Sequence, residues 1–151
     1  MVTVFEHGPY IQAALFCERA LTEKDGVISL IRVIDRVTHT VGGPSVPEQM
    51  APFVYPMTLV IMLKAGRATG SYQVRVDMEP PSTAVNRGPG VPIFLESGGD
   101  RGANIILQTQ VQFSEPGLYW FDVYFDEKLM TRIPFRVIYA RQTTPGPQPN
   151  P

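Results

Sequence analysis

The sequence predicts an all-β domain, a two-sheet antiparallel β-sandwich of about eight strands with at most one short helix. Fifteen prolines and thirteen glycines divide the 151 residues into short segments, which leaves little room for helices. Between these breaks, apolar and polar residues alternate with a period of two, as in strands with one buried face. Charged residues make up 18% of the chain, below the usual ~25%, which suits a β-protein better than one with surface helices.

The N-terminal half contains three clear candidate strands and one ambiguous segment. Residues 11–19 are ambiguous, because their alanines and Leu15 would also suit a short helix. Asp25-Gly26 is a favoured hairpin turn, and it precedes a β-branched strand over residues 27–37. After a loop at 42–52, two more strands are predicted: residues 57–64, apolar on both faces and hence central in a sheet, and residues 71–78, with Tyr72, Val74, Val76 and Met78 inward.

The C-terminal half continues the pattern to residue 141, so residues 1–141 are predicted to form one domain. The predicted elements are a loop to Gly90, an edge strand at 92–96, a turn at 98–102, and strands at 104–113, 118–125 and 130–139. In the last hairpin, Tyr119, Phe121 and Val123 face Ile133, Phe135 and Val137. Residues 142–151 carry proline at alternate positions and predict a disordered tail.

Charge and cysteine content exclude several classes of function. A net charge of -1 provides no general attraction to nucleic acid or to anionic lipid. The single cysteine, Cys17, excludes an intrachain disulfide and a multi-thiolate zinc site, and it suits a reducing compartment. The N-terminus lacks the pattern of a signal peptide, and the apolar run at 57–63 is too short to span a bilayer. We expect a soluble, cytoplasmic protein.

No catalytic or cofactor-binding constellation is visible. Cys17 is the one candidate thiol nucleophile, with His7 or His39 as its base, but burial as a small hydrophobic residue is the commoner fate of such a cysteine. A metal site would draw on His7, His39, Glu6, Glu18 and Asp35, which lack the spacing of known metal motifs. We therefore predict that the protein is not an enzyme and holds no metal or cofactor.

Two further motifs have ordinary explanations. The glycine-rich segment 98–102 resembles a phosphate-binding loop, but it leads into a strand and not into the helix that such loops need. A glycosidase needs two opposed carboxylates, and Asp122 and Asp126 share a strand face, but solvated surface acids are the ordinary explanation for them.

Three sets of residues remain as candidates for structural or binding roles. Asp35 has the parity of Val27, Ile31 and Val33, the predicted inward face, so it is either a hydrogen-bonded structural carboxylate or an exposed residue at a strand end. Trp120 and Tyr124 lie on the outward parity of the last hairpin, where they form a binding patch unless another segment covers them. Gln108, Gln110 and Gln112 form an uncharged polar face.

Two segments resemble known proteins. The stretch from Glu115 to Asp126, with Pro-Gly before alternating aromatics, resembles the penultimate strand of immunoglobulin-like sandwiches, which implies that fold and no activity. The pattern Cys17-Glu18-Arg19-Ala20, then residues 26–31, then Ile34-Asp35-Arg36-Val37, is similar to a family of small bacterial proteins of unknown function. One departure is Arg32-Val33, which stands where that family would have a glycine-containing pair.

The sequence thus favours a non-enzymatic module that binds a protein partner or a second copy of itself. The alternative is a sandwich that binds a small ligand or a carbohydrate, with the glutamines and aromatics in a groove. An enzyme would require Cys17, His39 and Asp35 to meet within hydrogen-bond reach.

Overall fold

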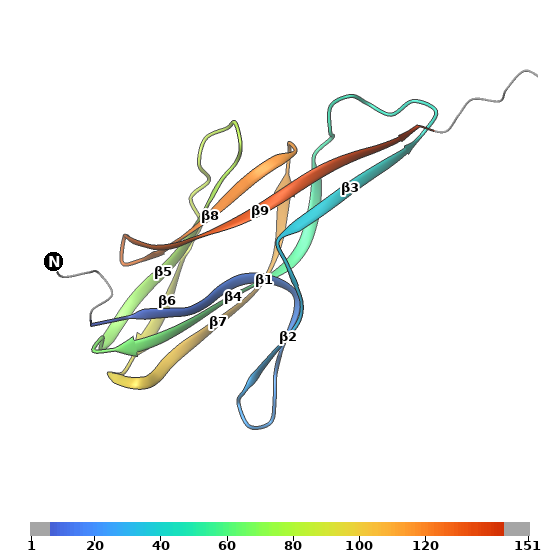
Figure 1. Cartoon of the computed structure of the whole chain (residues 1–151). Helices are drawn as coiled ribbons and strands as arrows, with labels where there is room; N and C mark the ends of the chain where they lie inside the picture. Colours follow the sequence, from blue (N-terminus) through green and yellow to red (C-terminus); the bar gives the residue numbers. More distant parts are fainter. Residues whose placement is uncertain (1–6, 144–151) are drawn as a thin grey trace, which may run out of the picture.

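Nine strands in two sheets make up the structure, a computed structural model that describes residues 7–143 (Figure 1). The predicted two-sheet sandwich is confirmed, with nine strands instead of eight. The strands are β1 (Tyr10–Thr22), β2 (Ile28–Ile34), β3 (Arg36–Gly43), β4 (Phe53–Gly66), β5 (Gly70–Glu79), β6 (Gly90–Leu95), β7 (Gly98–Phe113), β8 (Gly117–Phe125) and β9 (Lys128–Thr143). Residues 7–143 contain no helix long and apolar enough to cross a membrane.

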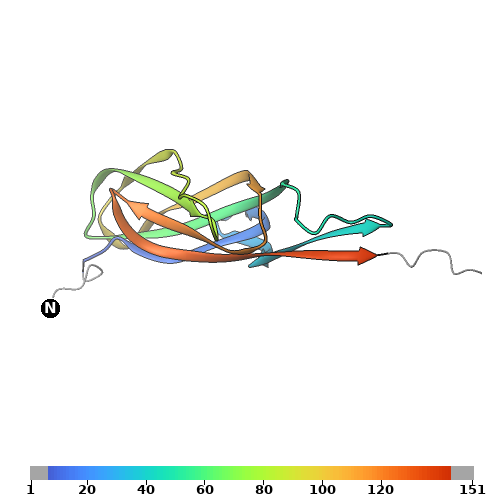
Figure 2. The same ribbon diagram turned by 90° about the horizontal axis from the view of Figure 1, so that it is seen from above.

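The strands are divided between a four-stranded sheet and a five-stranded sheet. The four-stranded sheet has the order β2-β1-β4-β7, and the five-stranded sheet has the order β3-β9-β8-β5-β6. Seen from above, the two sheets form stacked layers, and β3 and the end of β9 extend together beyond them (Figure 2). Strand β4 lies between β1 and β7, as its apolar faces predicted. Strands β7 and β6 end their respective sheets on the same side of the sandwich.

One predicted strand, residues 27–37, is broken in two at Asp35. Before the break, β2 pairs with β1 in the four-stranded sheet; after it, β3 pairs with β9 in the other sheet. The Arg136 N–H donates a hydrogen bond of 3.0 Å to the Asp35 carbonyl, which ties the crossover to β9. Because Arg36 aligns with Arg136 and the chain continues in the same direction, β3 and β9 are parallel. This parallel pair is an exception to the antiparallel pairing that the sequence predicts.

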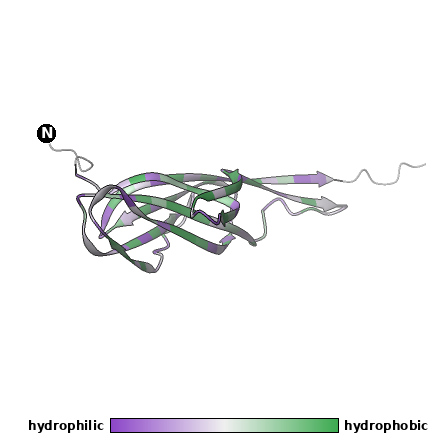
Figure 3. Ribbon diagram, turned by 90° about the horizontal axis from the view of Figure 1, so that it is seen from below, coloured by the Kyte–Doolittle hydropathy of each residue, from purple (hydrophilic) through white to green (hydrophobic). Residues whose placement is uncertain are grey.

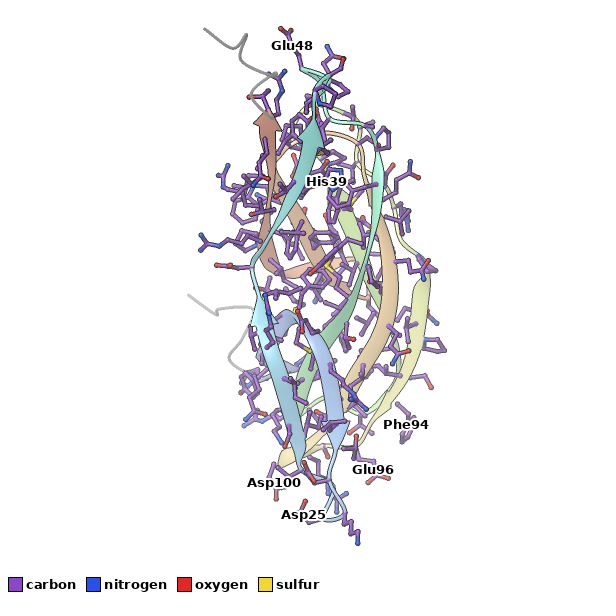
Figure 4. All side chains as sticks on the ribbon, turned by 90° about the vertical axis from the view of Figure 1, so that its right-hand side faces the viewer. Asp25, His39, Glu48, Phe94, Glu96 and Asp100 are labelled. Carbon is purple, nitrogen blue, oxygen red and sulfur yellow. The ribbon has the colours of Figure 1, made fainter. Side chains whose placement is uncertain are left out.

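The loop between β3 and β4 is hydrogen-bonded to the end of β9, beside the parallel pair. The Tyr139 hydroxyl donates a hydrogen bond to the Pro47 carbonyl, and Arg141 donates one to the Val46 carbonyl. Glu48 of this loop and Asp25 of the β1–β2 turn mark opposite ends of the molecule (Figure 4). The tip of β9 is hydrophilic, whereas hydrophobic residues are concentrated along the strands of the body (Figure 3).

Other local predictions have mixed outcomes. The ambiguous segment 11–19 lies within β1, so its helical alternative is wrong. Residues 98–102 belong to β7 and not to a turn, because they continue its pairing with the end of β4. Strand β9 extends two residues into the predicted tail, and residues 144–151 lie outside the described residues.

The core between the sheets is built around aromatic rings. Phe135, fully buried, lies 5.7 Å from the ring centres of both Phe16 and Phe113, and 6.4 Å from that of Phe121. These four rings come from β9, β1, β7 and β8, so they connect both sheets. Because such pairs stabilise beyond simple burial, this cluster is the centre of the hydrophobic core.

Tyr119 adds a polar anchor at the edge of this core. Its ring is buried, and its hydroxyl donates a hydrogen bond of 2.7 Å to the Glu115 carbonyl, which fixes the turn before β8. Burial raises the pKa of the Tyr119 hydroxyl, so it stays neutral at ordinary pH.

We expect Tyr119→Phe to lower the free energy of unfolding by about 1 kcal/mol, because one buried hydrogen bond is lost. Urea denaturation measures this change, and an unchanged midpoint would contradict it.

Candidate functional site

On the side where β5, β6 and β7 lie, the sandwich does not close over its core. Inward-facing residues of a sandwich are normally buried between the sheets. Here Leu107 and Val111 of β7 remain partly exposed, as do Val76 and Met78 of β5 and Val91 of β6. Further along the same strands, Ile105 and Phe113 are buried. The two sheets therefore separate locally between the middle of β7 and the second half of β5.

This separation leaves an open, largely apolar cavity of about 410 Å³. Its floor consists of core side chains from both sheets, and its mouth carries neutral polar groups and one arginine. The floor residues include Phe16, Leu59, Ile61, Val74, Ile105 and Phe121; the mouth residues include Asn86, Arg87, Thr109, Gln110 and Gln112. Ligand-binding pockets of proteins have volumes of about 300–1,000 Å³ and similar apolar linings. The cavity therefore has the size and chemistry of a small-molecule site.

The rim of the cavity is a short segment fixed to the edge of β5. Asn86 and Met78 exchange both backbone hydrogen bonds, at 2.8 and 2.9 Å. The Gly88 N–H donates a bond of 3.0 Å to Asp77 Oδ1. A Cβ at Gly88 would lie 2.1 Å from the Val76 carbonyl oxygen, so only glycine permits this close approach. The rim is thus held in place by hydrogen bonds and by the absence of a side chain.

The free edge of β7 lies beside the cavity mouth. Among the described strands, β7 pairs only with β4, so its other side presents unpaired backbone groups. From Gly102 to Phe113 it carries no charged residue and no proline. Natural proteins usually protect such edges with lysine, proline or a bulge. This edge is therefore open to pairing with another strand.

The predicted glutamine face lies on this same strand. Gln108, Gln110 and Gln112 are all exposed, as predicted. Gln108 and Gln110 also border a second, shallow hollow of about 460 Å³, whose other lining residues are Glu18, Pro56, Met57, Thr58 and Thr109. Because no aromatic ring lines this hollow, the structure does not place the glutamines beside an aromatic platform for a sugar.

The predicted aromatic patch on the last hairpin is partly covered by arginines. The Arg132 guanidinium lies 4.6 Å from the centre of the Trp120 ring, and that of Arg75 lies 4.5 Å from the Tyr124 ring. Both rings are half-buried. A guanidinium over an aromatic face is attracted by the ring's electrons. Trp120 and Tyr124 therefore belong to a mixed polar and aromatic face of the five-stranded sheet and not to a bare hydrophobic patch.

Two ion-paired aspartates occupy the middle of that face. Asp77 of β5 and Asp122 of β8 lie directly opposite each other, an arrangement that is unfavourable for like charges. Each carboxylate accepts hydrogen bonds from its own arginine: Asp77 from Arg75 at 2.9 and 3.2 Å, and Asp122 from Arg132 at 2.7 Å. The arginines thus neutralise the pair and permit its burial, since both aspartate residues are less than 10% exposed.

A second set of contacts connects this network to the cavity rim. Glu127, in the β8–β9 turn, accepts bonds from Arg75 at 2.5 Å and from Arg87 at 3.2 Å. Burial alone would raise the pKa of Asp77, but hydrogen bonds from Arg75 and from the Gly88 N–H lower it below its usual value. The hydrogen bond from Arg75 likewise lowers the pKa of Glu127. Asp77 is therefore ionised at neutral pH and holds the rim as a charged acceptor.

The sequence does not predict this network. Arg75 and Asp77 alternate with the inward-facing Val74 and Val76, which places them on the outer face of β5, but the pattern gives no sign that they are buried there. A signal existed, because an Arg-x-Asp step on one strand face places opposite charges side by side. The partners from β8 and β9 depend on strand order, which the sequence did not reveal.

Asp35 and its neighbours differ from the predicted inward face. Val27, Ile31 and Val33 are 60%, 44% and 58% exposed, so that face of the strand points to solvent. The reason is that β2 is an edge strand whose hairpin with β1 projects beyond the body (Figure 1). Asp35 is exposed, and its carboxylate pairs with Arg36 at 2.9 Å. Of the two predicted alternatives, it is therefore the exposed residue at a strand end. Its backbone carbonyl has the structural role, because it accepts the hydrogen bond from the Arg136 N–H.

Cys17, His39 and Asp35 have separate surroundings. Cys17 is fully buried, as predicted, between Val33 and Thr58 of the adjacent strands, and burial raises the pKa of its thiol. The His39 ring stacks on Phe53 at 4.1 Å, and Figure 4 shows it within the upper part of the molecule. No hydrogen bond or ion pair among the described residues joins these three side chains. Within residues 7–143, no cluster of three or more His, Cys, Asp or Glu is arranged to hold a metal ion.

Comparison with known proteins identifies a family and no activity. Residues 12–138 match the family described as "Family of unknown function (DUF6941)", which is most of the chain. The chain belongs to this family. The predicted resemblance to an uncharacterised family is therefore confirmed, and the segments that suggested it, from Cys17 to Val37, lie within the matched range. No curated protein matches the chain. Membership of the DUF6941 family leaves the function to be argued from the site.

Proposed function

We propose that this DUF6941 protein is a non-enzymatic assembly module in which two copies join through β7. The observation that supports this proposal most strongly is the free edge of β7, which carries no charge and no proline from Gly102 to Phe113. Pairing two such edges would extend each four-stranded sheet into a continuous sheet of eight strands. The exposed backbone groups would then gain partners, as in other complexes formed by strand addition.

A second copy is the partner that this edge fits best. In a two-fold antiparallel pair, the strand of one copy lies against the same strand of the other copy. A charged residue near the axis would therefore lie close to its own equivalent, a like charge. Strand β7 avoids this repulsion over its whole middle section. With the axis at Thr109, Leu107 of one copy would lie opposite Val111 of the other. These two side chains are half-buried in the single chain, and pairing would remove more of their apolar surface from water.

Multi-angle light scattering tests this proposal through the mass of the protein in solution. We expect wild type to have twice the mass of the 16.8 kDa chain. The double variant Gln108→Lys/Gln110→Lys should have the mass of one chain, because lysines on an edge strand would meet like charges across the axis. A matched control, Gln12→Lys/Gln142→Lys, adds the same charge at exposed glutamines of β1 and β9 and should remain a dimer.

Two outcomes would overturn the proposal. A wild-type protein that stays at the single-chain mass at high concentration has no self-association to explain. A dimer that survives both lysine pairs has its interface elsewhere on the molecule.

A further inference from the structure

The intersheet cavity has features of a ligand site that strand pairing alone does not explain. It opens between β5, β6 and β7, and apolar side chains that line it, such as Val76, Val91 and Leu107, remain partly exposed. Leaving such apolar surface accessible forfeits the stabilisation that closing the sheets would provide. The rim nevertheless holds the opening in a defined shape, because Asn86 and Gly88 are hydrogen-bonded to β5. An opening that is both apolar and held in shape suits a bound apolar molecule.

We propose that this cavity binds a neutral aliphatic amphiphile, such as a medium-chain primary alcohol, with its chain between the sheets and its hydroxyl at the mouth. The lining determines the chemistry of the chain: the interior side chains are aliphatic or aromatic and come from both sheets. Water has few polar partners there, whereas a hydrocarbon chain gains from the burial of its surface.

The mouth determines the chemistry of the head group. Asn86, Gln110 and Gln112 carry uncharged amide groups that donate and accept hydrogen bonds, whereas the Thr109 hydroxyl already donates to the Met57 carbonyl at 3.0 Å and can only accept. The one charged side chain, Arg87, is already paired with Glu127 at 3.2 Å. A carboxylate or phosphate would have to compete with Glu127, and it would approach the negative charge of that residue. A hydroxyl needs no such exchange.

The cavity volume limits the length of the chain. If each carbon and the hydroxyl take about the ~30 Å³ share of a water molecule, 410 Å³ holds about thirteen such groups, that is, about twelve carbons and the hydroxyl. Each methylene added inside the cavity should tighten binding about fourfold, from the usual ~0.8 kcal/mol of transfer free energy. The gain should end when the chain fills the space, at or before about twelve carbons.

The test is a competition assay with full-length protein. The neutral fluorophore N-phenyl-1-naphthylamine is bound first, and 1-alkanols from six to fourteen carbons then displace it. We expect one dye site per chain, an affinity rising about fourfold per methylene and then levelling off, and weaker displacement by decanoate than by 1-decanol. The double variant Val76→Phe/Val91→Phe fills the cavity from β5 and β6 and should weaken displacement by 1-decanol at least tenfold.

The control variant places the same substitutions outside the cavity. The variant Val27→Phe/Val54→Phe enlarges two exposed valines, one in the turn before β2 and one on β4. It should bind the dye and 1-decanol like wild type. Thermal unfolding of both variants shows whether each one folds.

Three results would overturn the proposal: no saturable dye binding, an affinity that rises without levelling off, or tighter binding of decanoate than of decanol. If the cavity variant does not fold, the chain-length series on wild type alone decides. The substitutions at Val76 and Val91 lie on β5 and β6 and leave β7 unchanged, so light scattering of the same variant shows whether a change in binding is separate from a change in the proposed dimer.

Discussion

Asp77→Asn is expected to lower the free energy of unfolding at pH 7 by about 2 kcal/mol. The substitution removes the carboxylate that accepts two hydrogen bonds from Arg75, and it weakens the acceptor of the Gly88 N–H. Breaking a deeply buried pair costs about 3–5 kcal/mol, but this pair is covered only by neighbouring side chains on an outer sheet face, so the smaller figure applies. Urea denaturation at pH 7 measures the difference.

The same variant should show how stability depends on pH. Because the pKa of Asp77 is lower in the folded protein than in the unfolded chain, its ionised form stabilises the fold above the unfolded pKa of about 3.9. That contribution is lost as the pH falls through the folded pKa. The gap between wild type and Asp77→Asn should therefore be full at pH 7 and should shrink below about pH 4.

Asp35→Asn is the matched control. Asp35 also accepts a hydrogen bond from an arginine at 2.9 Å, but both side chains of that pair are well exposed. Exposed ion pairs contribute little, so this variant should unfold at nearly the same urea concentration as wild type. If Asp77→Asn and Asp35→Asn lose the same free energy of unfolding, the burial of Asp77 adds nothing to the stability that its ion pair provides. A gap that stays constant from pH 7 to pH 3 would contradict the ionised role of Asp77.

The alternation of apolar and polar residues predicts which way a side chain faces, but it does not predict which other strands cover it. Alternation along one strand correctly placed Tyr72, Val74, Val76 and Met78 inward, because facing depends only on local geometry. The same alternation placed Arg75 and Asp77 outward, which is correct, but outward does not mean solvated. Their burial comes from Tyr124 and Glu127, about fifty residues later in the chain.

The break at Asp35 shows a second limit. The residues from Val27 to Val37 have one continuous β-branched pattern, and nothing local separates β2 from β3. The separation arises because two different strands, β1 and β9, compete for the two halves of the segment. Within β2, apolar residues occupy both faces of the strand, and the pattern alone assigned Ile31 and Val33 to the wrong side. Only the pairing partners define which face is inside.

The cavity could not be predicted for a similar reason. Leu107 and Val111 have the same parity as Ile105 and Phe113, and the sequence pattern treats all four as core. Their different exposure reflects the local separation of the two sheets, at the opening that the segment from Asn86 to Pro89 lines. That segment was predicted only as a loop without periodicity. Its glycine at position 88 was the one visible sign of a close approach.

Phe135→Ala is expected to have the largest effect on stability, a loss of about 4 kcal/mol in the free energy of unfolding. Phe135 is completely buried, and its ring contacts those of Phe16, Phe113 and Phe121. These rings belong to four strands in both sheets, so neighbouring side chains cannot close the space without moving the sheets. A loss of this size can unfold a domain of ordinary stability, and Phe135→Leu should show a smaller loss of about 1–2 kcal/mol that remains measurable.

Phe94→Ala is the control variant, because it removes a phenylalanine that lies outside the core. Phe94 is 62% exposed on the edge strand β6, and Figure 4 shows it projecting away from the strands. Its removal creates no cavity, so urea denaturation should place this variant within about 0.5 kcal/mol of wild type. If Phe135→Leu were as stable as wild type, the aromatic cluster would not be what holds the two sheets together. In that case the open side at β7 would have to be attributed to loose packing throughout the sandwich and not to a local separation of the sheets.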